Sequence, residues 1–126
     1  MTRQYAHKVD GNQGEIVTAL RQSGHQVVVL SRVGDSVPDL LVGRAGLWWL
    51  CENKADKGKL STGQVMFLRV AHGPVIVART AQEAIDKGGL VVSGRWTGAQ
   101  NLEQLKAEKG GGGHAERRME AQGFGI

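Results

Sequence analysis

The alternation of apolar and polar residues at the start of the chain predicts a helix followed by a strand. Residues 12–23 (NQGEIVTALRQS) place Ile16 and Leu20 at helical spacing, and Gly24 follows as a helix stop signal. Residues 25–32 (HQVVVLSR) are a short run rich in β-branched side chains. Such a run is typical of a buried strand.

The next segment has the pattern of a β-hairpin. Residues 33–38 (VGDSVP) are rich in turn-forming residues and predict a loop. Two apolar runs follow, 39–43 (DLLVG) and 47–54 (LWWLCENK), and the short segment 44–46 (RAG) separates them. Two strands joined by so short a turn predict an antiparallel pair.

A second helix, a fourth strand and a third helix are predicted next. Ser61 and Gln64 form the S-x-x-Q pattern of a capping box, and the pattern 74–79 (PVIVAR) predicts a strand. Thr80 is placed to cap a further helix over 81–87 (AQEAIDK). The buried side of the helix after Ser61 is expected to consist of Val65, Phe67, Leu68 and Val70.

The pattern weakens after Gly88. Residues 90–96 (LVVSGRW) predict an edge strand, and 100–109 (QNLEQLKAEK) predict a short amphipathic helix. Four consecutive glycines at 110–113 predict a flexible linker. We therefore expect a core over residues 1–88 and a C-terminal extension over 89–126 that contacts a partner or a second copy.

The order of these elements predicts the fold class. Helix, strand, hairpin, helix, strand and helix follow one another, which favours an α/β fold with a mixed four-stranded sheet flanked by helices.

Composition narrows the class of protein only a little. The chain has 126 residues, one domain by length, with 16 Lys and Arg against 12 Asp and Glu, a net charge of +4. This excess is compatible with nucleic acid as a partner. No apolar run is long enough to span a membrane, the first ten residues do not resemble a secretory signal, and the single cysteine, Cys51, excludes an internal disulfide. We expect a cytoplasmic protein.

Two carboxylates and one amine are predicted to meet at one end of the hairpin. Residues two apart on a strand point to the same face, so Glu52 and Lys54 project together and Asn53 projects away. A register centred on the turn at 44–46 makes Asp39 the opposite neighbour of Glu52. Two carboxylates this close repel each other unless a cation lies between them.

Oxygen ligands of this kind suit Mg²⁺ or Mn²⁺, and the backbone carbonyl of Asn53 could add a further ligand. A lysine beside the ion can orient a water and neutralise charge on a phosphate. The alternative is a turn residue at Asp39 and a surface ion pair between Glu52 and Lys54. Glu15, on the first helix, and Gln64, on the helix after Lys54, could each reach the same place and favour a functional site.

Four motifs in order resemble the PD-(D/E)XK nuclease superfamily, and most of all its virus-type replication-repair nuclease (VRR-NUC) branch. They are a helix glutamate at Glu15, the run GDSVPDLLVG at 34–43, the E-x-K strand LWWLCENK at 47–54 and the segment GKLSTGQ at 58–64. The branch commonly has an apolar residue where this chain has Asn53. The resemblance implies a restriction-endonuclease-like core in the order αβββαβ.

The resemblance also implies roles for these residues. Asp39 and Glu52 would hold the divalent ion, and Lys54 would act on the attacking water. Glu15 would bind the ion or orient one of its waters, and Gln64 would support the site. Small members of the branch resemble Holliday-junction resolvases, which act as homodimers, so the resemblance implies a homodimer that cuts branched DNA.

The basic residues that flank this site are candidates for DNA-backbone contacts, namely Arg32, Lys57 and Lys59. Two other functions remain open at this point. One is a nicking or homing-type DNA endonuclease that uses the C-terminal extension to bind its site. The other is a non-catalytic DNA-binding subunit with the same fold, which would show no metal-dependent cleavage.

Overall fold

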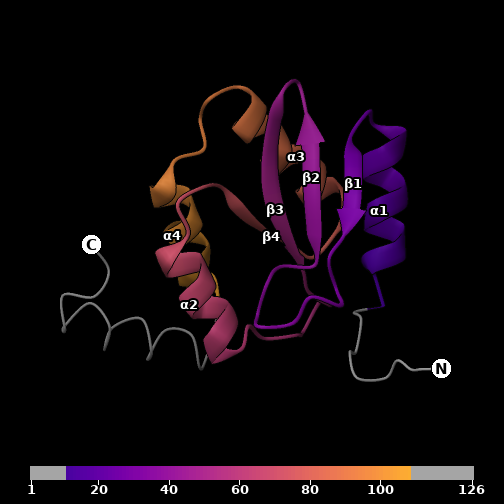
Figure 1. The fold of residues 1–126 in the computed structure, drawn as a ribbon. Coiled ribbons are helices and arrows are strands. Elements are labelled where there is room, and N and C mark those ends of the chain that lie inside the picture. The colour runs from indigo at the N-terminus through magenta and orange to yellow at the C-terminus, as the bar shows by residue number, and fades with distance from the viewer. Residues whose placement is uncertain (1–10, 109–126) are drawn as a thin grey trace.

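The computed structural model describes residues 11–108, which form four helices and four strands. Figure 1 shows the strands side by side with helices packed around them. The remaining residues, including the glycine run at 110–113, lie outside the described part. The elements are α1 (Gln13–Gln22), β1 (Gln26–Val29), β2 (Leu40–Arg44), β3 (Leu47–Asn53), α2 (Thr62–Val70), β4 (Val75–Ala78), α3 (Ala81–Val92) and α4 (Gly98–Lys106).

The four strands form one mixed sheet in the order β1-β2-β3-β4, which confirms the predicted fold class. β2 is antiparallel to both β1 and β3, and β4 runs parallel to β3. The hairpin turn has positive φ at both of its residues, Ala45 (55°) and Gly46 (79°), as tight hairpin turns favour. Gly43 pairs with Trp48, which is the predicted register.

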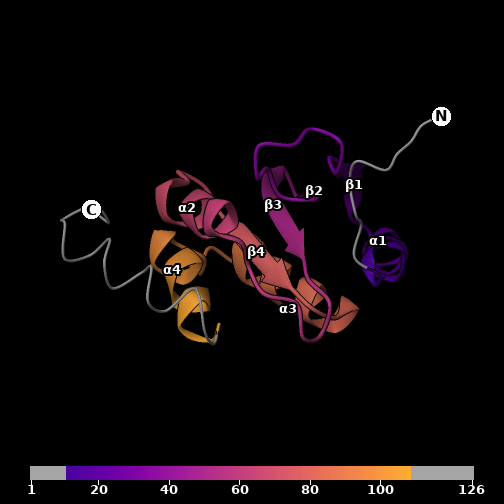
Figure 2. The ribbon, with the colours of Figure 1, turned by 90° about the horizontal axis from the view of Figure 1, so that it is seen from below.

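Helices cover the sheet from two sides (Figures 1 and 2). On one side, α1 and α3 pack against alternate residues of the strands, among them Trp49 and Cys51 of β3. On the other side, α2 and α4 pack against Leu50 of β3 and against β4. The first core contains Ile16, Leu20, Leu40, Val42, Ile76 and Ala84, and the second contains Leu60, Val65, Leu68, Val75, Val77 and Leu105.

The outer edge of β4 is covered by amide side chains of α4. Asn101 Oδ1 accepts a hydrogen bond from the backbone N–H of Val75 (2.9 Å), and Gln104 Oε1 accepts one from Val77 (2.7 Å). Gln104 Nε2 donates to the carbonyl of Val75 (2.8 Å), and Lys87 Nζ donates to that of Val77 (2.7 Å). These side chains therefore take the place of a further strand.

The predicted edge strand at 90–96 is wrong, because α3 continues to Val92. Gly88 suggested a helix end, but it is a buried contact: a Cβ there would lie 2.9 Å from Cζ2 of Trp49. The boundary expected after Gly88 falls inside α3, and Leu105 lies in the second core. Residues 89–108 are thus packed into the same fold as the sheet.

Some predicted burial also differs from the structure. β1 is an edge strand with Val28 and Val29 exposed, so the expectation of a buried strand is wrong. Val70 is exposed at the end of α2 and does not join its buried side. Trp49 is buried, whereas Trp48 is half-exposed and its ring lies over Gly43.

Among residues 11–108, no helix has the length and apolar character needed to cross a membrane.

The edge contacts of α4 predict a stability effect at Asn101. Its side chain also donates to the carbonyl of Gly73 (2.9 Å) and accepts from Trp96 Nε1 (2.8 Å). Asn101→Ala leaves the buried N–H of Val75 without its acceptor. We expect the free energy of unfolding in urea to fall by about 2–4 kcal/mol, despite the higher helix propensity of alanine.

The matched control is Glu103→Ala, at an exposed position of the same helix, which pairs only with Lys106 (3.5 Å) among the described residues. We expect a change within about 0.5 kcal/mol for this variant. A loss for Asn101→Ala no larger than that of the control would contradict the proposed role of the α4 amides.

Candidate active site

The start of β2 and the end of β3 bring Asp39, Glu52 and Lys54 together. Asp39 directly precedes β2, and continuing the observed register by one residue from the Leu40–Cys51 pair places it opposite Glu52. Asp39 Oδ2 accepts a hydrogen bond from the backbone N–H of Asn53 (2.9 Å). Since Cys51 lies in the first core, Glu52 and Lys54 occur on the opposite face, the one that α2 covers.

Gln64 connects the first turn of α2 to Glu52. Its Oε1 accepts from the backbone N–H of Ser61 (2.8 Å), and Ser61 Oγ accepts from the backbone N–H of Gln64 (3.1 Å), which confirms the predicted capping box. Its Nε2 donates to Glu52 Oε2 (3.0 Å). Because the cap uses the amide oxygen, the amide nitrogen is directed at the carboxylate. One side chain thus caps a helix and holds Glu52, which is 5% exposed.

The loop that leads to Asp39 packs against the first turn of α2. A Cβ on Gly63 would collide with Ser36 Oγ, so a larger residue at this position requires Ser36 to shift. Ser36 and its neighbour Asp35 both have positive φ (62° and 55°), which is uncommon for residues other than glycine. A small depression next to this contact is lined by Ser36, Pro38, Glu52, Leu60, Gln64, Phe67, Leu68 and Val75.

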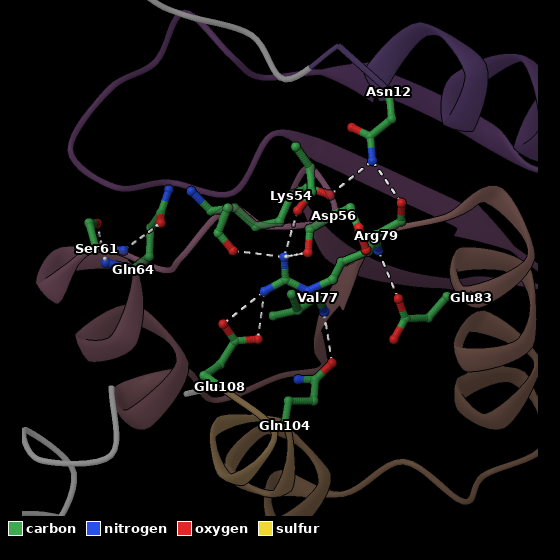
Figure 3. A network of polar contacts seen from close by, with 12 residues as sticks. Asn12, Lys54, Asp56, Ser61, Gln64, Val77, Arg79, Glu83, Gln104 and Glu108 are labelled. Atoms are coloured by element: carbon green, nitrogen blue, oxygen red, sulfur yellow. Dashed lines mark hydrogen bonds and ion pairs between the residues drawn. The ribbon is translucent and has the colours of Figure 1, made fainter. Parts of the chain in front are cut away.

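The backbone of Lys54 is held from two sides. Its N–H donates to the carbonyl of Ala78 (3.1 Å), and its carbonyl accepts from Asn12 Nδ2 (2.9 Å). Asn12 precedes α1 but makes no side-chain cap bond, and it donates instead to Lys54 and to the carbonyl of Arg79 (2.8 Å). In Figure 3 the Lys54 side chain extends from this anchor towards Gln64. Its Cδ would contact a Cβ on Gly58 at 3.6 Å.

Glu15 takes part in none of the contacts described above for Asp39, Glu52 and Lys54. Glu15 is exposed on α1, whereas Gln13 is buried and its Oε1 accepts a hydrogen bond from Ser31 Oγ (3.2 Å). Gln13 therefore links α1 to the loop that ends at Asp39. The role expected for Glu15 stays a prediction.

The three basic residues predicted to contact DNA are all exposed. Lys57 and Lys59 line a hollow of about 270 Å³ together with Asp56, Arg79 and Glu108. This hollow lies beside the turn that directly follows Lys54. Arg32 lies apart from it, in the loop after β1.

The donor set at Asp39 and Glu52 fits a hard divalent cation, since Mg²⁺ binds to one or two carboxylates and takes its other ligands from water and phosphate. Within residues 11–108, no group of three or more His, Cys, Asp or Glu side chains is arranged to hold a metal. A cation here would be bound by two carboxylates. The carbonyl of Asn53, at the end of β3, stays a predicted third ligand.

Cys51 lies between the two carboxylates in sequence but serves the core. Burial raises the pKa of its thiol well above the ordinary value, and the negative charges of Asp39 and Glu52 raise it further. The thiol is therefore neutral and donates weakly to Asn53 Oδ1 (3.5 Å). A neutral, buried thiol is not a nucleophile.

Sequence reasoning missed several residues that support the site, because their contacts are long-range. Asn12 has the sequence signal of a helix cap, yet it binds residues 42 and 67 positions away. Gly63 occurs in the first turn of a helix, and its sequence context does not indicate its contact with Ser36.

Comparison of the chain with known protein families, curated proteins and solved structures finds no match.

The contact between Gln64 and Glu52 predicts a pH-dependent loss of stability for Gln64→Glu. The variant keeps an oxygen for the capping box but places a second carboxylate beside Glu52. At pH 7.5 both are ionised and repel, and we expect the free energy of unfolding to fall by about 1–3 kcal/mol. Because repulsion raises the pKa of these carboxyls in the folded state, acidification protonates them and reduces the loss.

Urea unfolding at pH 7.5 and near pH 4.5 measures this effect. Gln64→Ala is the control, because it removes both hydrogen bonds without adding charge, and its loss should change less between the two pH values than the loss for Gln64→Glu. A Gln64→Glu variant as stable as the wild type at pH 7.5 would contradict the observed contact.

Proposed function

We propose that this chain is a metal-dependent DNA endonuclease that hydrolyses phosphodiester bonds. The observation that carries the proposal is the shared position of Asp39, Glu52 and Lys54 at one end of the sheet, with Gln64 bonded to Glu52. The motifs that resemble the VRR-NUC branch contain these same residues. The observed element order, with one helix before three strands and a helix and strand after them, is compatible with the expected nuclease core.

In the proposed mechanism, a Mg²⁺ or Mn²⁺ ion at Asp39 and Glu52 would supply Lewis-acid activation when bound. The chain's own residues provide the geometry. The N–H of Asn53 holds the Asp39 carboxylate, and Gln64 holds that of Glu52. The Lys54 ammonium donates a hydrogen bond to the attacking water or the scissile phosphate, and its charge offsets the negative charge that develops there.

The DNA backbone would extend from Lys54 over the following turn. Lys57 and Lys59 are exposed there at the rim of one hollow, where phosphates can reach them. Arg32, exposed in the loop that precedes Asp39, would add a further contact. Such contacts position DNA without reading its sequence.

We further propose that the enzyme is a homodimer and prefers branched DNA, such as a Holliday junction. β1 is an edge strand, and Val28 (40%) on β1 and Trp48 (49%) on β3 are exposed on either side of β2, on the sheet face that bears Glu52. A second copy could cover this apolar surface around a two-fold axis. Two sites related in this way could cut opposed strands of a junction.

The test is cleavage of labelled four-way junction, flap, nicked and linear DNA, with Mg²⁺ or Mn²⁺ and with EDTA. Lys54→Ala should lower the cleavage rate by roughly 100-fold or more, because an electrostatic contact to the reacting phosphate is lost. Lys106→Ala is the matched control: this exposed lysine on α4 pairs only with Glu103 among the described residues. Its rate should stay within about twofold of the wild type.

The outcomes test the nuclease activity and the preference for junctions separately. Paired cuts in the junction, lost in Lys54→Ala, support both the site and junction resolution. Cleavage of nicked or linear DNA alone supports the nuclease but favours a nicking or homing-type enzyme. DNA binding without metal-dependent cleavage would contradict the enzyme and favour a non-catalytic DNA-binding subunit.

A further inference from the structure

Arg79, at the end of β4, contacts the turn that follows Lys54 (Figure 3). Its Nη1 lies 2.6 Å from the carbonyl oxygen of Ala55 and 2.7 Å from that of Gly58, with the carbonyl of Asp56 at 3.4 Å. Its Nη2 donates to both carboxylate oxygens of Glu108 (2.8 and 2.9 Å). One guanidinium thus joins the turn at 55–58 to Glu108, two residues after the end of α4.

The backbone of Arg79 is fixed as well. Its N–H donates to Glu83 Oε1 (2.7 Å) at the start of α3. Its carbonyl accepts from Asn12 Nδ2, and the same nitrogen donates to the carbonyl of Lys54. The backbones of Lys54 and Arg79 are therefore held by the same side-chain amide, and the guanidinium reaches back to the carbonyls of Ala55, Asp56 and Gly58.

The turn at 55–58 has little else to hold it. Ala55, Asp56 and Lys57 are exposed, and the turn has one backbone hydrogen bond of its own, from Gly58 N–H to the carbonyl of Ala55 (3.0 Å). Ordering such a segment costs backbone conformational entropy at every residue. Charge-assisted hydrogen bonds to several carbonyls offset part of that cost.

Arginine suits this position and lysine does not. The planar guanidinium presents several donors in a rigid fork, so that one side can meet carbonyls while the other meets a carboxylate. A lysine ammonium is a point donor and cannot span both groups. Glu108, whose side chain is 9% exposed, supplies the opposite charge and holds the fork in one orientation.

We infer that Arg79 is a positioning residue, oriented by Glu108, that fixes the turn at 55–58. Through that turn it sets where the Lys54 side chain lies, since the Cδ of Lys54 lies close to Gly58. It also sets the place of Lys57 beside the hollow that Arg79 lines. The effect on Lys54 rests on the proposed nuclease function, whereas the ordering of the turn does not.

The first measurement is independent of activity. Limited trypsin digestion of the native protein, read by mass spectrometry, gives the rate of cleavage after Lys57 and Lys59. We expect Arg79→Lys and Glu108→Gln to raise this rate several-fold, and Arg79→Ala more. The control is Arg95→Ala, at an exposed arginine after α3, which should leave the rate unchanged. Arg79→Lys and Glu108→Gln keep the test valid if Arg79→Ala does not fold.

The second measurement is DNA cleavage by the same variants. Loss of the clamp should lower kcat by about 10–100-fold, the effect expected when a reacting group is displaced by an ångström or so. Added methylguanidinium, at concentrations well below denaturing ones, should restore part of the rate to Arg79→Ala, and methylammonium should not. If Arg79→Ala had lost activity only because it is less stable, methylguanidinium and methylammonium would have the same effect on its rate.

The results distinguish the positioning role of Arg79 from the proposed nuclease function. Unchanged digestion of the turn in both Arg79→Lys and Arg79→Ala overturns the inference, whether or not the wild type cuts DNA. Faster digestion with wild-type kcat overturns the positioning of Lys54. Faster digestion of the variants, with no cleavage of DNA by the wild type, supports the clamp on the turn and contradicts the nuclease.

Discussion

The pairing of β2 with β3 is the constraint on which the candidate site depends. Asp39 and Glu52 become neighbours only because the turn at Ala45-Gly46 sets Gly43 opposite Trp48. A slip of one residue would move the side chains of one strand to the other face of the sheet. The buried residues on both sides of the hairpin oppose such a slip, because it would expose Val42 or Trp49 and bury polar groups in their place.

This register buries a charged side chain, which is energetically unfavourable, and a hydrogen bond from α2 offsets part of that energy. It places Glu52, an acidic side chain, at a nearly buried position, where an ionised carboxylate without partners is strongly unfavourable. The Gln64 amide supplies a hydrogen bond at 3.0 Å, and its orientation is already fixed by the helix cap at Ser61. The local signal that starts α2 is therefore also what stabilises the acid. Under the proposed function, a divalent cation at Asp39 and Glu52 would add an opposite charge beside the two carboxylates.

The elements that sequence could predict are those whose causes are local. The helix start at Ser61, the hairpin register and the alternation along β3 depend on residues a few positions apart, and each is confirmed. What could not be predicted depends on distant contacts. Gly88 has the pattern of a helix end, but the ring of Trp49 packs against it and α3 continues. Likewise, neither Asn12 nor Arg79 has a neighbour in sequence that indicates its link to Lys54.

The contacts of α4 show that residues 98–108 are packed into the same fold as the sheet. Its amides occupy the edge of β4, which would otherwise present unpaired backbone groups, and Glu108 after it binds the guanidinium of Arg79. Both contacts act at β4, the strand that directly adjoins Glu52 through its parallel pairing with β3. A shift of α4 would therefore be transmitted to the turn beyond Lys54 through the side chain of Arg79. Residues 98–108 belong to the architecture of the site, even though no candidate catalytic residue lies among them.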